Sequence, residues 1–112
     1  MIKIVFYTFK GGYSGFKING HSNFDVKGKD IVCAAISALS QHTAKMLVKH
    51  CGARIVARQE GLLEVALNNI DNFSNVVLSE FKESIEDLQS QYPRNISLEV
   101  KEDANRHTVV CS

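Results

Sequence analysis

A histidine and a cysteine in the first third of the chain have the residue types and the setting of a nucleophilic pair. His21 follows Gly20 at the end of a predicted strand, and Cys33 lies in the first turn of a predicted helix. Thiol catalysis needs a sulfur and a base that takes its proton and later protonates a leaving amine. Helix-start N–H groups and the positive end of the helix dipole favour thiolate over thiol. We therefore expect Cys33 to be a nucleophile and His21 its general base and acid.

The competing interpretation of Cys33 is that of a buried core residue. It lies in an apolar run, and free cysteine is among the most frequently buried residue types. Gly28 and Asp30 mark a helix start, which puts Cys33 near position N3, where backbone donors are unsatisfied. The same N–H groups could hold the oxyanion of a tetrahedral intermediate. A short loop also joins the strand end to the helix start, so His21 and Cys33 can be neighbours.

Three further residues are candidates for supporting roles. Asp30 is three positions before Cys33 and fits either a helix N-cap or an orienting partner for His21. Ser37, one turn after Cys33, either faces the same pocket or packs against the sheet. Gly20 would let the backbone or a bound peptide approach closely. The sequence leaves both alternatives open.

The loop between the strand and the helix is a candidate lid over the site. Phe24 at its centre fits either a lid or a side chain tucked into the core. The loop consists of Ser22, Asn23, Phe24, Asp25, Val26 and Lys27.

Composition narrows the classes of partner. The 112 residues carry 13 basic and 12 acidic side chains, a net charge of +1, which favours neither nucleic acid nor an anionic membrane as partner. We find no apolar run approaching the roughly 20 residues of a membrane span, and no signal-peptide cleavage pattern. Three cysteines, an odd number, argue against a disulfide framework and for a reducing cytoplasm. Cys51 and Cys111, taken with His50 and His107, match no zinc-ligand spacing, so we expect no metal and no other cofactor.

The elements that must position the pair follow from hydrophobic periodicity. Their order, ββαββαβ, predicts one α+β domain over residues 1–112, with a mainly antiparallel sheet and two amphipathic helices packed on it. Apolar surface beyond what one sheet covers also suggests a homodimer. We predict strands over 2–9, 16–21, 54–58, 62–67 and 96–100, helices over 30–50 and 72–92, and an edge strand or tail over 107–111.

Each helix has a predicted core stripe. In the first helix it comprises Val32, Ile36, Leu39, Thr43, Met46 and Leu47. In the second it comprises Phe73, Val77, Phe81, Ile85 and Leu88, with Val76 and Leu78 outside it.

The combination of motifs resembles a known family. A strand ending in Gly-His, a variable loop, and then Gly-x-Asp-Ile-Val-Cys-Ala-Ala-x-Ser are similar to the Prp family of bacterial ribosomal-processing cysteine proteases. The matching residues are Gly20, His21, Gly28, Asp30, Ile31, Val32, Cys33, Ala34, Ala35 and Ser37. The order of elements agrees up to about residue 100, and residues 101–112 are expected to be a C-terminal extension. The chain departs from the family pattern at Ser22, where alanine is more usual, and at Lys29, where an acidic or neutral residue is common.

The resemblance implies a small homodimeric endopeptidase. Such enzymes remove a short N-terminal extension from a large-subunit ribosomal protein, the twenty-seventh in the standard bacterial naming, and cut after a phenylalanine. Carried over, Cys33 is the nucleophile, His21 the general base and acid, and Asp30 and Ser37 support the site. The loop over residues 22–27 is the segment that orders over substrate.

Two hypotheses from other classes compete with the protease. A non-catalytic ribosome-associated binding protein would keep the fold without a reactive Cys33. A redox-sensing thiol protein would form sulfenic acid or an intermolecular disulfide at Cys33 under peroxide, with no peptidase activity.

Overall fold

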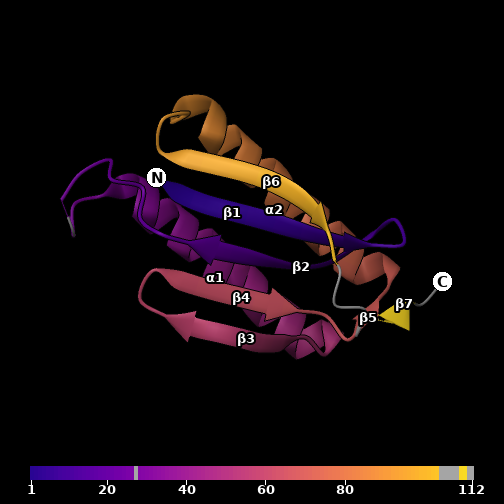
Figure 1. The fold of residues 1–112 in the computed structure, drawn as a ribbon. Helices are drawn as coiled ribbons and strands as arrows, with labels where there is room; N and C mark the ends of the chain where they lie inside the picture. The colour runs from indigo at the N-terminus through magenta and orange to yellow at the C-terminus, as the bar shows by residue number, and fades with distance from the viewer. Residues whose placement is uncertain (27, 104–108, 111–112) are drawn as a thin grey trace.

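The chain folds into one five-stranded sheet backed by two helices (Figure 1). The computed structural model describes residues 1–26, 28–103 and 109–110. The predicted α+β class and the order ββαββαβ are confirmed, with two short strands, β5 and β7, added to it. The elements are β1 (Ile2–Phe9), β2 (Gly12–Asn19), α1 (Ile31–Cys51), β3 (Arg54–Gln59), β4 (Leu62–Ala66), β5 (Asn69–Ile70), α2 (Asn72–Gln91), β6 (Ile96–Glu102) and β7 (Val109–Val110).

The sheet is mixed, with strand order β3-β4-β2-β1-β6. The pairs β1–β2, β2–β4 and β3–β4 are antiparallel, while β1 and β6 are parallel. The β1–β2 hairpin turns through Lys10 and Gly11, both with positive φ, as tight hairpin turns require. Because β2 lies between β1 and β4, the chain leaves the middle of the sheet at Asn19 and enters the loop that carries His21.

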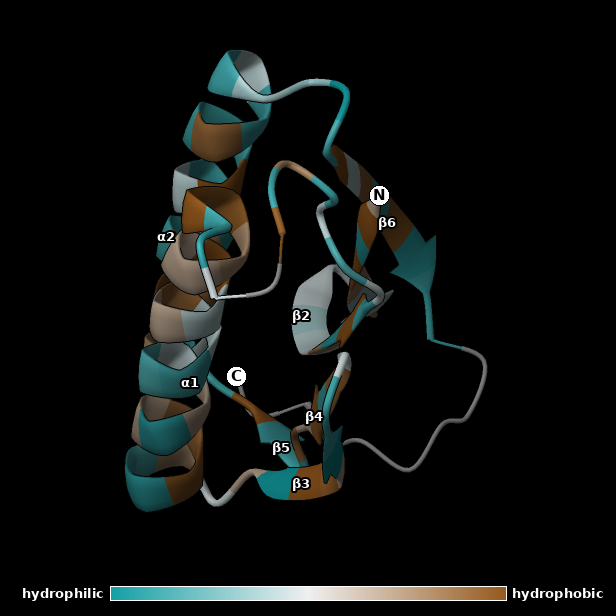
Figure 2. Ribbon diagram, turned by 90° about the vertical axis from the view of Figure 1, so that its left-hand side faces the viewer, coloured by the Kyte–Doolittle hydropathy of each residue, from teal (hydrophilic) through white to brown (hydrophobic). Residues whose placement is uncertain are grey.

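Both helices cover the same face of the sheet. Figure 2 shows α1 and α2 as one layer, with the strands on the other side of the core. Phe6, Phe16 and Phe81 form the centre of this core, with ring centroids of the Phe16–Phe81 pair 4.9 Å apart and of the Phe6–Phe81 pair 5.4 Å apart. Burying each ring stabilises the fold by about 1.5–3 kcal/mol. Phe81 thereby fixes α2 on the sheet, while Val32 and Ile36, in the same core cluster, fix the start of α1.

The buried face of α2 differs from the predicted stripe. Leu78 is fully buried, whereas Phe73 is half exposed and Val76 is exposed. The helix begins at an Asp71 cap that turns Ser74 into the core, and this sets the rotation of everything that follows. The prediction placed Phe73 on the core face and was wrong there, while Phe81 and Ile85 are buried as predicted.

Two smaller differences concern β1 and α1. A register shift between Tyr7 and Thr8 turns Phe9 into the core, although strict alternation predicts Thr8 there. In α1, Leu39 and Met46 are only partly buried, and Ser40 and Ala44 take core positions beside Val32, Ile36, Thr43 and Leu47.

By length and composition alone, α1 could also cross a membrane, which the sequence pattern did not indicate. A helix that packs in the core of a domain meets the same length and composition criteria, and α1 packs against α2 and the sheet.

The C-terminal segment departs from the predicted edge strand. β6 continues to Glu102, two residues beyond its predicted end. β7 pairs in parallel with β5 in a separate two-stranded sheet, so it adds nothing to the edge of the main sheet. The other residues of the predicted segment over 107–111, His107 and Cys111 among them, lie outside the described residues.

Candidate active site

The start of α1 places the Cys33 thiol. Asp30 is the N-cap, with extended backbone angles, and its Oδ1 accepts the backbone N–H of Cys33 at 2.9 Å. Cys33 is therefore at position N3, as the sequence predicts, and the cap interpretation of Asp30 is confirmed. Gly28, with φ +89°, makes the turn that leads into the cap. The sulfur is thus held at the open end of the helix, and Cys33 is only partly buried.

The second carboxylate oxygen of Asp30 holds the loop before the helix. Asp30 Oδ2 accepts the Ser22 hydroxyl at 2.6 Å, the Phe24 N–H at 3.0 Å and the Asp25 N–H at 3.3 Å. Burial of this carboxyl group raises its pKa, but these bonds and the one from Cys33 outweigh it and lower the pKa to about 2. Among the residues that the structure describes, the Asp30 side chain accepts hydrogen bonds from these four residues and none from His21.

Ser22 contacts the sulfur twice. Its backbone N–H donates to Cys33 Sγ at 3.2 Å, and the Cys33 thiol donates to Ser22 Oγ, also at 3.2 Å. The residue is buried, although the four residues that follow it, Asn23 to Val26, are exposed. Asn95, in the connection between α2 and β6, donates its side-chain N–H to Ser22 O at 2.9 Å. The residue beside the thiol is therefore fixed from both sides.

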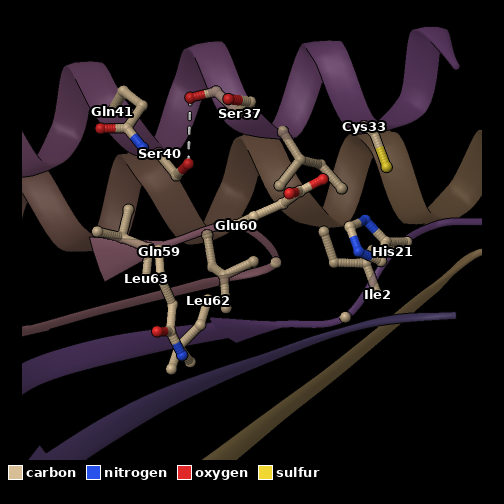
Figure 3. Close-up of a pocket in the computed structure, with 14 residues that line it drawn as sticks. Ile2, His21, Cys33, Ser37, Ser40, Gln41, Gln59, Glu60, Leu62 and Leu63 are labelled. Atoms are coloured by element: carbon tan, nitrogen blue, oxygen red, sulfur yellow. Dashed lines mark hydrogen bonds between the residues drawn. The ribbon is translucent and has the colours of Figure 1, made fainter. Parts of the chain in front are cut away.

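His21 lies against the turn between β3 and β4. Gly61, with φ +74°, makes room for the ring, because a Cβ added there would be 3.2 Å from His21 Nε2. The Gly20 N–H donates to Gly61 O at 2.9 Å and ties the two segments together. Figure 3 shows the Cys33 sulfur pointing from α1 toward the His21 imidazole. Within the described residues no hydrogen bond joins them, and catalytic bonds are often loose without substrate.

Two adjoining hollows meet at these residues. One has a volume of about 300 Å³ and the other about 530 Å³, and His21, Cys33, Ser37 and Glu60 border both. These volumes are in the range of sites for small molecules or peptide side chains. Apolar side chains line part of the smaller hollow, namely Ile2, Ile18, Ile36, Leu62 and Leu63.

The remaining predicted site residues are partly gathered here. Ser37 is exposed at the border of the hollows, and Asn23 and Asp25 line the larger one. Phe24 packs edge to face on Tyr92, with ring centroids 5.2 Å apart, and is half exposed. It is thus no core side chain, contrary to one of the two alternatives. Val26 is exposed, and Lys27 lies outside the described residues.

Glu60 and Gly61 are the site residues that the sequence analysis missed. It recognised them only as a turn. The signal was the hairpin itself, because pairing β4 with β2 sets Leu62 opposite Asn19 and so brings the turn beside Gly20 and His21. That pairing is long-range and does not follow from local pattern.

The other histidine and cysteine side chains that the structure describes do not gather into a second site. Among residues 1–26, 28–103 and 109–110, no three histidine, cysteine or acidic side chains gather as metal ligands would. His50 packs against the ring of Phe73. Burial, with a smaller contribution from Asp71, raises the pKa of the Cys51 thiol, which makes it a poor nucleophile.

A thiol at a helix start, facing an imidazole over an open hollow, is the arrangement used by cysteine hydrolases. The sequence model of the family described as "Cysteine protease Prp" matches residues 1–97. The chain belongs to this family, and the prediction of a cysteine protease is confirmed. Among the curated proteins none matches.

Solved structures share the fold. The essential ribosomal processing protease Prp from S. aureus, in complex with a covalently linked product peptide, is 21% identical with a TM-score of 0.77, covering 90% of this chain and 100% of that chain. The same protease in complex with a substrate peptide gives 21% and 0.74, with the same coverage. SMU.848 from Streptococcus mutans gives 22% and 0.71, covering 92% of this chain and 96% of that chain.

Proposed function

We propose that this protein is an endopeptidase in which Cys33 attacks the scissile carbonyl and His21 transfers the protons. The observation that carries the proposal is the position of Cys33 at N3 of α1, with its sulfur directed toward His21 at the edge of an open hollow. His21 is a base close to the thiol, the start of α1 favours the thiolate, and the hollow beside Cys33 has room for a peptide.

The reaction is acyl transfer in two stages. His21 takes the Cys33 proton, and the sulfur adds to the peptide carbonyl to form a tetrahedral oxyanion. Collapse breaks the C–N bond, His21 protonates the departing amine, and the acyl group remains on Cys33 as a thioester. His21 then takes a proton from a water molecule, and the resulting hydroxide attacks the thioester. The carboxylic acid leaves, and the proton returns to the sulfur.

The donors for the oxyanion are only in part those expected at a helix start. The Cys33 N–H is occupied by Asp30 Oδ1, so it cannot serve without breaking the cap. The Ser22 N–H points at the sulfur from 3.2 Å, beside the place where the oxyanion would form. Ser22 N–H, together with the first N–H groups of α1, is therefore the donor set that we propose.

As substrate we propose the N-terminal extension of the twenty-seventh large-subunit ribosomal protein, cut after phenylalanine. The family match and the peptide complexes of the S. aureus protease support a peptide of this kind. The apolar lining of the smaller hollow, with Ile18 and Leu63, suits an aromatic side chain. Asp30 and Ser37 support the site, and the loop over 22–27 closes on the bound peptide.

We also propose that the enzyme acts in the cytoplasm as a homodimer. Several apolar side chains on the helices remain exposed, with Ile31 at 57% and Val76 at 58%, and a second copy of the chain would cover such side chains. Light scattering of the purified protein tests this: a mass of two chains is expected, and a single-chain mass over the working concentration range would contradict it.

A peptide that spans an extended ribosomal N-terminus tests the function. The peptide is incubated with the wild-type protein and with Cys33→Ala, and the products are identified by mass spectrometry. A single cut after phenylalanine that disappears in Cys33→Ala is expected. Cutting by the folded Cys33→Ala protein would exclude this mechanism, and no cutting by folded wild-type protein would exclude this substrate.

A further inference from the structure

Ser22 forms the middle of a chain of polar groups that runs from the thiol to a carboxylate. Cys33 Sγ is 3.2 Å from Ser22 Oγ, and Ser22 Oγ is 2.6 Å from Asp30 Oδ2. The Ser22 residue is 1% exposed, so no bulk water competes for its hydroxyl.

The direction of these hydrogen bonds follows from the inventory of protons. A serine hydroxyl has one proton, and an ionised carboxylate can only accept. The short contact with Asp30 is charge-assisted, and such bonds are about twice as strong as neutral ones. The Ser22 proton therefore lies toward Asp30, and its oxygen presents lone pairs to the sulfur. Toward Cys33, Ser22 Oγ can act only as an acceptor.

An acceptor beside the sulfur favours the thiol over the thiolate. The S–H group has a partner in Ser22 Oγ, whereas a thiolate would face lone pairs backed by the Asp30 charge. To donate to a thiolate, the hydroxyl would have to give up its bond to Asp30. The Ser22 N–H also donates to the sulfur and by itself favours the thiolate, but this backbone contact remains when the side chain is changed.

We propose that Ser22 is a positioning residue that keeps the resting Cys33 protonated, with its S–H directed at the Ser22 hydroxyl, until His21 takes the proton. This inference rests on Cys33 being the nucleophile. The titratable groups that line the hollows with Cys33 are His21, Asp25, Asp30 and Glu60. Ser22→Ala removes none of these groups, but it does remove one of the hydrogen bonds that Asp30 accepts.

The test is the pH profile of Cys33 alkylation by iodoacetamide, followed by peptide mass spectrometry so that Cys33 is read separately from Cys51. In Ser22→Ala we expect the midpoint of the profile to fall by about half to one pH unit, which raises the alkylation rate below the midpoint by about three- to tenfold. Ser22→Thr keeps the hydroxyl and is expected to restore the wild-type midpoint. An unchanged or higher midpoint in folded Ser22→Ala would overturn the inference.

Ser14 provides a matched control. It is also 1% exposed and also donates its hydroxyl to a carboxylate, Asp103 Oδ2 at 3.0 Å, but near the opposite end of β2. Ser14→Ala loses a comparable buried bond and is expected to keep the wild-type profile. If both alanine variants shift the midpoint equally, the shift results from a general loss of packing in the fold, and the assignment to Ser22 fails.

Infrared spectroscopy gives a reading that needs no Ser22 variant. The difference spectrum of wild-type minus Cys33→Ala at neutral pH should contain an S–H stretching band at the lowered frequency of a hydrogen-bonded thiol. Its absence would overturn the inference even if Ser22→Ala fails to fold. Neither readout uses a peptide substrate, so failure of the proposed cleavage and failure of the Ser22 assignment are separable.

Discussion

The two helices begin with the same device and use it differently. At α1, Asp30 accepts the N–H of Cys33 at 2.9 Å, and at α2, Asp71 accepts the N–H of Ser74 at 2.8 Å. Ser74 is fully buried and returns the bond, because its hydroxyl accepts the Asp71 N–H at 3.1 Å. Cys33 does not return the bond, and its sulfur is held by Ser22 from the preceding loop.

The difference lies in where the third helical residue directs its side chain. At α2 the Asp71 and Ser74 side chains each accept the other residue's N–H, and this capping box stabilises the helix start. At α1 the carboxylate caps the helix with one oxygen and holds the loop before it with the other. The cap is thereby coupled to the segment that carries His21, while the thiol is left at a hollow. The comparison shows how one capping motif becomes a site when its N3 residue is a nucleophile.

Replacing the N3 residue of each helix by alanine should give the largest difference between α1 and α2. Cys33→Ala is expected to lower kcat/KM for the peptide by on the order of 10³-fold or more, with little change in stability. Ser74→Ala is expected to leave kcat/KM unchanged and to lower the free energy of unfolding by about 1 kcal/mol. Peptide cleavage assays and urea denaturation of both variants check this. Equal losses of activity would remove the distinction.

Removing the base should have the next largest effect. His21→Ala is expected to lower kcat by about 10²- to 10⁴-fold, because proton transfer contributes that much in related chemistry. His42→Ala, on an exposed position of α1, is the matched control and should keep wild-type kinetics. If His21→Ala retains most of the wild-type kcat, the base must be sought elsewhere in the site.

The Asp30 carboxylate should make the stability of the fold depend on pH in acid. The Asp30 carboxyl has a pKa of about 2 in the folded protein, below the value of about 3.9 in an unfolded chain. The folded state then binds fewer protons than the unfolded state between these values, so the stabilisation is complete above about pH 4 and is lost as pH falls toward 2. Asp30→Asn should therefore flatten the fall of stability across this window, and it should reduce cleavage several-fold by releasing the loop.

Asp71→Asn is the control for that measurement. It removes the same charge from a helix cap without touching the loop, so peptide cleavage should remain at the wild-type rate. Urea denaturation in steps from pH 5 to pH 2.5 compares the variants. A profile for Asp30→Asn as steep as that of the wild type would contradict the low pKa.

Two glycines with positive φ give the smallest expected effect. A Cβ at Gly61 would lie 3.2 Å from His21 Nε2, whereas a Cβ at Gly52, the C-cap of α1, meets nothing within 4 Å. Both alanine variants should lose about 1 kcal/mol of stability, because each places a side chain in the left-handed region. Only Gly61→Ala is expected to lower kcat/KM as well, by a few-fold. Equal kinetics in the two variants would mean that Gly61 does not position His21.

How far the sequence predicts the site depends on the range of the interaction. The Asp30 cap and Cys33 at N3 are local features, set by a few neighbouring residues. The position of Cys33 was predicted, and the cap was one of the two roles that the sequence left open for Asp30. The contact of Gly61 with His21 requires knowing that β4 pairs with β2 and in which register, which local pattern does not encode. The bonds of Ser22 depend on side-chain geometry within a folded loop and were likewise not predicted.

The same reasoning applies to the fold. The alternation in β1 and the helical periodicity predict the elements and the α+β class. Leu78 was missed because the Asp71 cap, and the buried Ser74 with it, determine the rotation of α2. Phe9 was missed because an irregularity in the hairpin reverses the alternation at its end.

The most direct test of the central claim is to trap the intermediate. Wild-type protein is mixed with the ribosomal peptide, quenched in acid within the first turnover, and digested for peptide mapping by mass spectrometry. The account predicts a thioester between the N-terminal fragment of the substrate and Cys33, absent from Cys33→Ala. Cleavage that proceeds at the full rate with Cys33 blocked by iodoacetamide would contradict it.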